Sequence, residues 1–277
     1  MTIFGIDISN NNGSDIDLAE VVREGFSFVF AKVSEGVDFV DATWPGYRDT
    51  AHANGLVVAG YHYLRGDCDP DAQAELFVDR LGDAAAMIDF EANSGGMNIF
   101  WAFVNAVNKR GRRIDLSYIP RWYWLQIGSP DLSQVPGLIQ SSYVGGTGCA
   151  ADLYPGDISP NWNGFGGKAV DLLQFTDAAL VAGHTVDANA FRGSVDDLRH
   201  LLGMTPPTTQ GDLMALNDSQ QADLYQKVQD IWGQLLGPDG QGWPQLGLNP
   251  EGKNLTLVDA VAKLGSEVRT ELPKAAS

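Results

Sequence analysis

Cysteine is scarce in this sequence, which has two among 277 residues, Cys68 and Cys149. Two cysteines are too few for the disulfide network of a small secreted scaffold, and no His or Cys cluster has the spacing of metal ligands. Nor does a glycine-rich phosphate-binding loop of either standard type occur. We therefore expect no required metal or other cofactor. The two thiols could form a bridge only if the fold brought them together, which the sequence leaves open.

Positive charge is also scarce. The chain has 18 Lys and Arg residues against 35 Asp and Glu residues, which gives a formal net charge of −17. Proteins that bind nucleic acid hold its phosphates with clusters of Lys and Arg, and no such cluster is present. A nucleic-acid partner is therefore excluded, and the same acidity provides no attraction to an anionic cell envelope.

Long apolar runs are missing as well. No stretch is long enough to span a bilayer. Residues 1–8 begin directly on a strand-like pattern, without the basic segment and apolar run of a signal peptide. We expect a protein that is made in the cytoplasm, does not insert into a membrane and depends on another route to leave the cell.

Residues 1–203 alternate between strand-like and helix-like segments. The strand-like segments are 3–9, 26–33, 56–63, 85–91, 114–118, 138–143 and 169–175, and the helix-like ones are 18–24, 45–54, 72–81 and 97–110. Gly25, Gly55 and Gly111 each follow a helix-like segment, where glycine commonly ends a helix. Repeated strand–helix units indicate a parallel sheet.

Polar residues indicate whether that sheet is open or closed. Gly5, Asp7 and Ser9 alternate with apolar residues in the first segment, and Asp89 and Glu91 do the same at the end of the fourth. An open parallel sheet is covered by helices on both faces and would tolerate such acids poorly. In a barrel, inward-facing polar residues gather at the C-terminal ends of the strands. We therefore predict an α/β fold, an irregular TIM-like β/α barrel.

The composition changes near Met204. Residues 204–211 are typical of a linker, which separates a barrel at 1–203 from a C-terminal segment at 212–277. That segment has two rows of apolar residues at the spacing of a coiled-coil seam: Leu224, Val228, Ile231 and Leu235, then Leu257, Val261, Leu264 and Val268. They predict a small helical appendage, either a helical hairpin with 237–253 folded over it or a coiled coil that joins copies of the chain. The heptad spacing favours self-association.

A long loop at 145–167 contains Tyr154, Trp162 and Phe165. Interleaved aromatic residues in a functional loop can form a wall that contacts sugars. A surface loop that packs its own aromatic side chains is an equal alternative.

Asp89-Phe90-Glu91 is the central candidate for chemistry. Residues two apart on a strand share a face, so both carboxyl groups would enter one cavity. Two carboxyl groups so close cannot both ionise freely, and one pKa must rise. A carboxyl group that keeps its proton near neutral pH can protonate the leaving oxygen of a glycoside.

Asp7 and Asp187 extend this candidate site. Each is a single acid within an apolar stretch, Ile6-Asp7-Ile8 and Val186-Asp187-Ala188. Barrel closure brings the first and last strands together, and so would place Asp187 near Asp7. By contrast, we expect Lys32 and Glu35 to form an internal ion pair and His62 to be a packed, hydrogen-bonded residue rather than a catalytic base.

Several motifs occur together in one order: FGIDIS at 4–9, FVFAKVSEG at 28–36, GYHY at 60–63, DFE at 89–91, LQF at 173–175 and VD at 186–187. This order resembles glycoside hydrolase family 25, the muramidases or lysozymes, over roughly residues 2–203. YIPRWYW at 118–124 and YPGD at 154–157 resemble endolysins of phages that infect mycobacteria and related actinobacteria. The C-terminal segment does not resemble the choline-binding repeats or bacterial SH3-type domains that many family members carry.

The resemblance implies a barrel that hydrolyses the β-1,4 bond between N-acetylmuramic acid and N-acetylglucosamine in bacterial peptidoglycan. It assigns Glu91 as proton donor, with Asp7, Asp89 and Asp187 as partner acids. The second step would use the substrate's own acetamido group, assisted by Asp89, or a direct Asp nucleophile. Tyr61, Tyr63, Tyr143 and Gln174 match family positions that line the substrate cleft.

The resemblance implies an endolysin that acts at the bacterial cell wall. The main alternative is a virion-associated or wall-binding protein that uses the same barrel with weak or no turnover. Retention of all four acids counts against it, because a binding module has no need of an acid with a raised pKa. Hydrolysis of another polysaccharide that carries acetamido groups, such as chitin, is a third interpretation.

Overall fold

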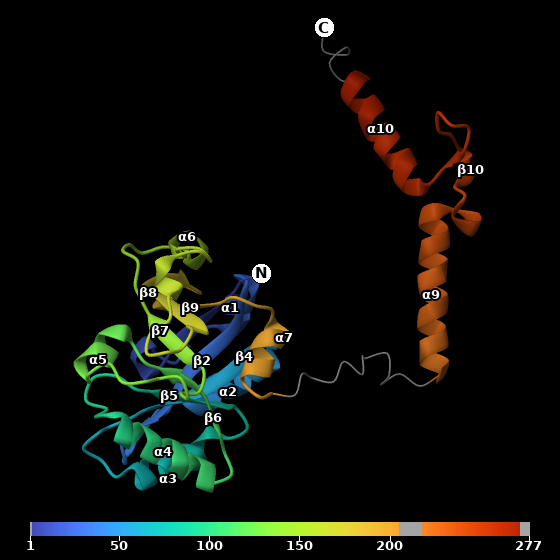
Figure 1. The fold of residues 1–277 in the computed structure, drawn as a ribbon. Coiled ribbons are helices and arrows are strands. Elements are labelled where there is room, and N and C mark those ends of the chain that lie inside the picture. The colour runs from blue at the N-terminus through green and yellow to red at the C-terminus, as the bar shows by residue number, and fades with distance from the viewer. Residues whose placement is uncertain (1, 205–217, 272–277) are drawn as a thin grey trace. The chain divides into compact units, whose positions relative to one another are not determined.

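In the computed structural model, which describes residues 2–204 and 218–271, the chain forms two units (Figure 1). One spans residues 1–206 and the other residues 207–277. The predicted linker at 204–211 lies, apart from Met204, outside the described residues. No described helix is both long and apolar enough to cross a membrane.

The first unit is built around a ring of strands. Their bounds are β1 (Ile3–Ile8), β2 (Phe26–Glu35), β4 (Val57–Tyr63), β5 (Ala85–Asp89), β6 (Ile114–Tyr118), β7 (Leu138–Ser141), β8 (Leu172–Val181) and β9 (His184–Phe191). The sheet order is β1-β9-β8-β7-β6-β5-β4-β2, and a further pairing of β1 with β2 closes the ring. The predicted closed β/α barrel is therefore confirmed. A short strand, β3 (Phe39–Val40), pairs only with β2.

Helices cover the outside of the ring. They are α1 (Leu18–Arg23), α2 (Trp44–Ala53), α3 (Pro70–Leu81), α4 (Met97–Lys109), α5 (Arg121–Gln126), α6 (Ala150–Leu153) and α7 (Val195–Leu201). The first four agree with the predicted helices to within two residues. Local signals explain their starts: Asp17 and Asp69 accept hydrogen bonds from the first backbone N–H groups of α1 and α3, and Pro70 opens α3.

The barrel has two apolar layers, one outside the strands and one inside. Ile6, Ile8 and Ile88 face the helices, whereas Phe28, Phe30 and Met87 fill the interior. The interior is tight: a Cβ at Gly5 would lie 2.1 Å from the ring of Phe28. A glycine is therefore required where β1 passes this ring, and the lower half of the barrel is a packed core rather than a channel.

The strand β9 is the exception to the parallel arrangement. It runs antiparallel to both β1 and β8, while the other neighbours in the ring are parallel. Because β9 runs the opposite way, its first residues lie at the end of the barrel where the parallel strands finish. Asp187 is thereby placed directly opposite Asp7 in the strand register, as barrel closure predicted.

Several sequence-based bounds need correction. The fourth predicted strand ends at Asp89 rather than Glu91, and β8 covers 172–181 rather than 169–175. Trp162 and Phe165 are buried, and Tyr154 packs against Phe4 with ring centroids 5.2 Å apart. The loop at 145–167 thus packs its own aromatic residues, and the interpretation of these three as a sugar-contacting wall is wrong. Cys68 and Cys149 are both free thiols.

The second unit consists of two helices and a connecting segment. α9 (Asp218–Leu236) is followed by a 3-10 turn, η3 (Pro238–Gly240), the paired strands β10 (Trp243–Leu248) and β11 (Asn254–Leu255), and α10 (Leu257–Glu271). The connecting segment folds back on the end of α9, where the indole Nε1 of Trp243 donates to the carbonyl oxygen of Gln234 at 3.0 Å. Two helices are present as predicted, with a strand pair between them.

Candidate active site

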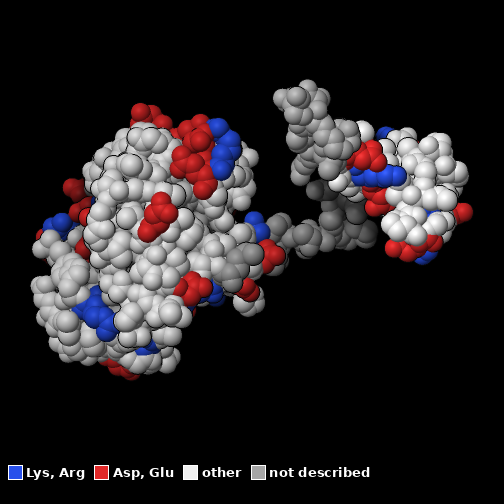
Figure 2. Space-filling model, turned by 90° about the horizontal axis from the view of Figure 1, so that it is seen from above, with Lys and Arg blue, Asp and Glu red and all other residues white. Residues whose placement is uncertain are grey.

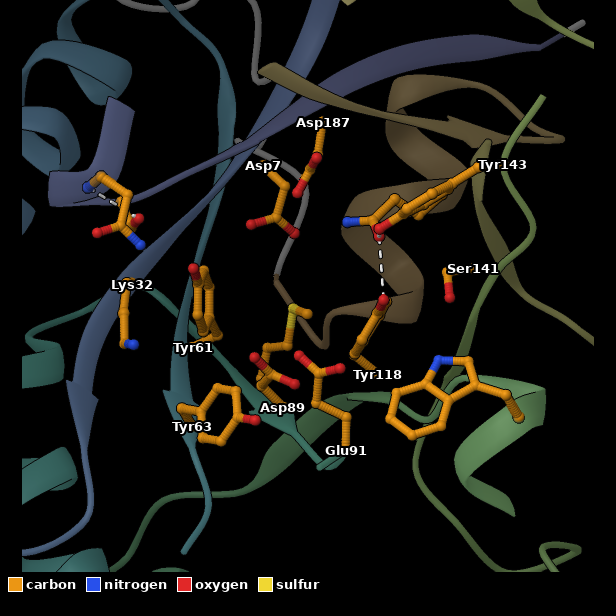
Figure 3. A pocket seen from close by; sticks show the side chains of 15 residues that line it. Asp7, Lys32, Tyr61, Tyr63, Asp89, Glu91, Tyr118, Ser141, Tyr143 and Asp187 are labelled. Carbon is orange, nitrogen blue, oxygen red and sulfur yellow. Dashed lines mark hydrogen bonds between the residues drawn. The ribbon is translucent and has the colours of Figure 1, made fainter. Parts of the chain in front are cut away.

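A cleft opens at the end of the barrel where the parallel strands finish (Figure 3). Its volume is about 550 Å³. The lining side chains are Asp7, Ser9, Asn11, Lys32, Tyr61, Tyr63, Met87, Asp89, Glu91, Tyr118, Trp122, Ser141, Tyr143, Gln174 and Asp187. All eight residues that the sequence nominated for catalysis or substrate binding are in this set, so the fold brings them into one cavity.

The four acids form two pairs. Asp7 and Asp187 project together from β1 and β9, and Asp89 and Glu91 project together from the end of β5, with the central space between the pairs (Figure 3). Asp7 and Asp89 are each 8% exposed, whereas Glu91 is only half-buried. One oxygen of Asp89, Oδ1, is buried and has no hydrogen-bond partner among the residues that the structure describes.

Burial dominates the electrostatics of these carboxyl groups. Loss of solvent raises the pKa of Asp7 and of Asp89 well above the ordinary range, and the charges of neighbouring acids add to the effect. Burial also raises the pKa of Glu91, against the opposing charge of Lys32, and raises the pKa of Asp187 to about 7. The cleft can therefore hold protonated carboxyl groups at a pH where an exposed acid is ionised.

Lys32 contributes a positive charge to this acidic cleft. Its Nζ lies 2.6 Å from Oε2 of Glu35, and Arg65 approaches the other oxygen of Glu35 at 3.1 Å. The same Nζ lies 5.2 Å from the ring centroids of both Phe39 and Tyr63, at a distance that suits a cation–π contact. The predicted internal pair of Lys32 with Glu35 is confirmed, but Lys32 also lines the cleft, which the sequence argument did not foresee.

Tyrosines surround the acids. The hydroxyls of Tyr118 and Tyr143 both donate to Oε1 of Gln174, at 3.1 and 2.7 Å. The hydroxyl of Tyr63 donates to the carbonyl oxygen of Ala92 at 2.7 Å. Burial, together with the charges of nearby acids, raises the pKa of Tyr61. These phenols stay protonated and can donate to or stack on a ligand in the cleft.

The turn after β5 fixes the position of Glu91. The backbone N–H of Glu91 donates to Oγ of Ser94 at 3.1 Å, and that hydroxyl donates to the carbonyl oxygen of Leu64 at 2.7 Å. A Cβ at Gly66 would lie 2.7 Å from the backbone nitrogen of Gly95, so the loops after β4 and β5 are in close contact. Glu91, the candidate proton donor, therefore lies on a loop that these contacts hold in place, although it is beyond the last residue of β5.

Several residues that line the cleft were not predicted from the sequence. Trp122, at the start of α5, is 48% exposed and borders the cleft, and Tyr118 ends β6 on the same side. The aromatic run at 118–124, at the end of a parallel strand, could have indicated them.

His62 is not among the lining residues. It is fully buried, with Nδ1 2.9 Å from Oγ of Ser34, as expected of a packed histidine. Among the described residues, no three His, Cys, Asp or Glu side chains are arranged so that they could hold a metal ion together.

The barrel resembles known lysozymes. A lysozyme from Streptomyces coelicolor superposes with a TM-score of 0.60 at 21% identity, covering 72% of this chain and 96% of that one. An autolytic lysozyme from Clostridium acetobutylicum is 28% identical over 215 residues, which cover 70% of this chain and 62% of that protein.

The C-terminal unit resembles a different protein. Residues 216–272 match the Rv3766 C-terminal domain. The uncharacterized protein Rv3766 of Mycobacterium tuberculosis is 46% identical over 85 residues, which cover 27% of this chain and 31% of that protein. The chain therefore spans less than two thirds of the length of either curated relative.

The family model named Glycosyl hydrolases family 25 matches residues 6–144. This range begins in β1 and extends just past β7, and it includes Asp7, Asp89 and Glu91 at the cleft. Asp187 and Gln174 lie beyond it and join the site through β9 and β8. Since the match covers half of the chain, this protein belongs to glycosyl hydrolases family 25.

Proposed function

We propose that this protein is a peptidoglycan muramidase, which hydrolyses the β-1,4 bond between N-acetylmuramic acid and N-acetylglucosamine. The observation that carries the proposal is the pairing of Glu91, half-buried on a braced turn, with the buried Asp89 at the floor of an open cleft. The family membership and the lysozyme relatives support the substrate class.

Glu91 acts as the general acid. Its raised pKa keeps the proton available, and its partial exposure lets the carboxyl group reach the oxygen of the scissile bond. As the bond to C1 breaks, the leaving sugar takes this proton and Glu91 becomes a carboxylate. The same carboxylate then removes a proton from the incoming water, which restores the acid.

Asp89 assists the substrate's own acetamido group. The acetamido oxygen attacks C1 from the opposite side and forms a cyclic intermediate, and the acetamido N–H donates to a carboxyl oxygen of Asp89 as positive charge develops. Oδ1 of Asp89 is buried and has no hydrogen-bond partner in the described parts of the chain, so it is available to accept this bond. Water then opens the ring with net retention, a recognised departure from the two-carboxylate scheme.

We further propose that the protein works as an endolysin of a phage that infects mycobacteria or related actinobacteria. The match of the C-terminal unit to a domain of a Mycobacterium tuberculosis protein supports this host range. A virion-borne enzyme would use the same chemistry. A binding module without turnover would not need the raised pKa of Glu91, so we favour the active enzyme.

The test is release of new reducing ends from purified actinobacterial peptidoglycan, with chitin oligomers digested in parallel. Glu91→Gln keeps the shape of the side chain but removes its proton, so we expect a loss on the order of 10²-fold or more. Asp89→Asn should lower kcat with little change in KM, because the Asp89 side chain is proposed to stabilise the intermediate and not the bound substrate. Ser129→Ala, on a loop outside the cleft, is the control.

Muramic acid at the new reducing ends would identify the bond that is cut. Release of reducing ends from chitin alone would show that the substrate is a polysaccharide other than peptidoglycan. A folded native chain that binds peptidoglycan without releasing any reducing ends would contradict the proposed muramidase activity and favour a wall-binding protein.

A further inference from the structure

The second unit has almost no core of its own. Among the residues of this unit that the structure describes, Leu255 is the only buried hydrophobic residue. A small unit that buries so little apolar surface usually depends on disulfides, a metal or association with another chain for its stability. Both cysteines are in the barrel, and no metal-holding cluster occurs among the described residues. Association is the remaining means of stabilisation.

Both helices carry an uncovered apolar seam. The exposed seam residues, at 38–62% exposure, are Leu224, Val228, Ile231 and Leu235 on α9, and Leu257, Val261, Leu264 and Val268 on α10. The helical hairpin that the sequence allowed would bury these two rows against each other. In the structure the connecting segment contacts the end of α9, but neither row is covered within the unit.

The composition of the α10 seam suits pairing with an identical seam. In heptad terms, α10 has Val261 and Val268 at a positions and Leu257 and Leu264 at d positions, whereas α9 has Val228 and Leu235 at a and Leu224 and Ile231 at d. β-Branched residues at a with leucine at d favour two-stranded association, and the α10 seam follows this rule at every position. Tyr225 and Trp232, which are 66% and 43% exposed, widen the seam of α9 on one side.

Charge does not oppose a second copy. No acidic residue lies in either seam or at the e and g heptad positions that flank the seam of α9, and Glu267 is the single acidic residue at the corresponding positions of α10. Asp223, on the outer side of α9, pairs with Lys227 along the helix at 2.8 Å. Much of the face of this unit seen in Figure 2 carries no charged side chain. Acidic residues outnumber basic ones in residues 207–277, so the unit offers no attraction to an anionic wall polymer.

We propose that the C-terminal unit is a dimerisation module, in which the seams of α9 and α10 pack against the same seams of a second copy of this chain. Such an interface is self-complementary, because each copy supplies the same two rows. The four helices together would form the apolar core that one copy lacks.

The test is the mass of the full chain in solution. Since one chain has a mass of 29.8 kDa, we expect sedimentation velocity at micromolar concentration to give twice that value. The double variant Val228→Ala/Val261→Ala removes seam volume with the best helix-forming residue, so it cannot act by breaking the helices. We expect it to raise the dimer dissociation constant at least about tenfold.

Gln229→Lys and Ala262→Lys are the matched controls, because each lies one residue from a seam valine but outside the seam. Both should sediment as the native dimer, whereas Val228→Lys and Val261→Lys should sediment as monomers. A native chain that stays monomeric up to 100-fold higher concentration would overturn the proposal and favour another partner for the seams. A dimer that survives both lysine substitutions together would place the interface elsewhere.

Discussion

The barrel and the C-terminal unit both have regularly spaced apolar residues, but the result is burial in one and exposure in the other. In the barrel, Ile6 and Ile88 alternate with acids and are completely buried. In the C-terminal unit, Val228 and Val261 recur with heptad spacing and are 53% and 62% exposed. A ring of strands closes on itself and creates an inside, whereas two short helices joined by a strand pair do not. The spacing of apolar residues therefore predicts which face of an element is apolar, but not which other segment packs against that face.

The two regions also differ in how they treat charge. Asp7 and Asp89 are buried beside other acids, at the cost of raised pKa values. In the C-terminal unit, Asp223 pairs with Lys227 at the surface. Thr256 precedes α10, and its hydroxyl and backbone N–H donate to the carboxyl group of Asp259, which lowers the pKa of Asp259. Buried neighbouring acids weaken a fold, so acids placed in this way indicate a candidate functional site.

The largest expected difference between the regions concerns packing. Phe77 is fully buried against His62 and Phe103, so Phe77→Ala should lower the free energy of unfolding of the barrel by about 3–5 kcal/mol. Ile231→Ala, on the exposed seam of α9, should change the free energy of unfolding of the C-terminal unit by less than about 0.5 kcal/mol at high dilution. Urea denaturation measures both. Equal losses would mean that the seam is buried within one chain.

An intermediate effect concerns pH and stability. The pKa of Asp187 is about 7 in the folded barrel and near 3.8 when unfolded, so the folded state binds the extra proton between these values. Stability therefore falls as pH rises through this window. Asp187→Asn should stabilise the barrel at pH 8 by on the order of 1 kcal/mol and have less effect at pH 5.

Thermal unfolding at both pH values measures this difference. Asp230→Asn, on the exposed side of α9, is the control and should leave the pH dependence of barrel unfolding unchanged. A barrel whose stability rises from pH 5 to pH 8 would contradict the burial of these acids.

The smallest expected effect is a change in the pH dependence of catalysis. Lys32 holds down the pKa of Asp89 and of Glu91, so Lys32→Met should raise both. If Glu91 is the acid, the alkaline limb of kcat/KM against pH should move to higher pH. Arg65→Met removes the other cation beside Glu35 without touching the cleft, and should move the limb less. A shift toward lower pH would argue against Glu91 as the acid.

Much of the site followed from local sequence alone. The alternation around Asp7 and Asp89 predicted inward-facing acids at strand ends, because side-chain direction in a strand has a period of two residues. The resemblance to a known family added Tyr61, Tyr63, Tyr143 and Gln174, and all four line the cleft. By contrast, Lys32 was predicted only as half of an ion pair, since nothing local to it indicates which end of the barrel it faces.

The aromatic residues show a second limit. Trp162 and Phe165 are buried under their own loop, while Trp122 borders the cleft. All three lie in irregular or short helical segments, where no simple period fixes the direction of a side chain. Their positions depend on how the loops pack over the barrel, which composition does not encode.

The sequence by itself determined the ring of strands, the acids at their ends and the two apolar seams, because each depends on spacing along the chain. Barrel closure predicted that Asp187 lies near Asp7, but only the tertiary structure decided that β9 runs antiparallel and sets the two acids in register, across 180 residues of sequence. It also decided that the seams of α9 and α10 remain open. Contacts between distant segments follow from chain closure and from the space left by other side chains, and neither is a local property.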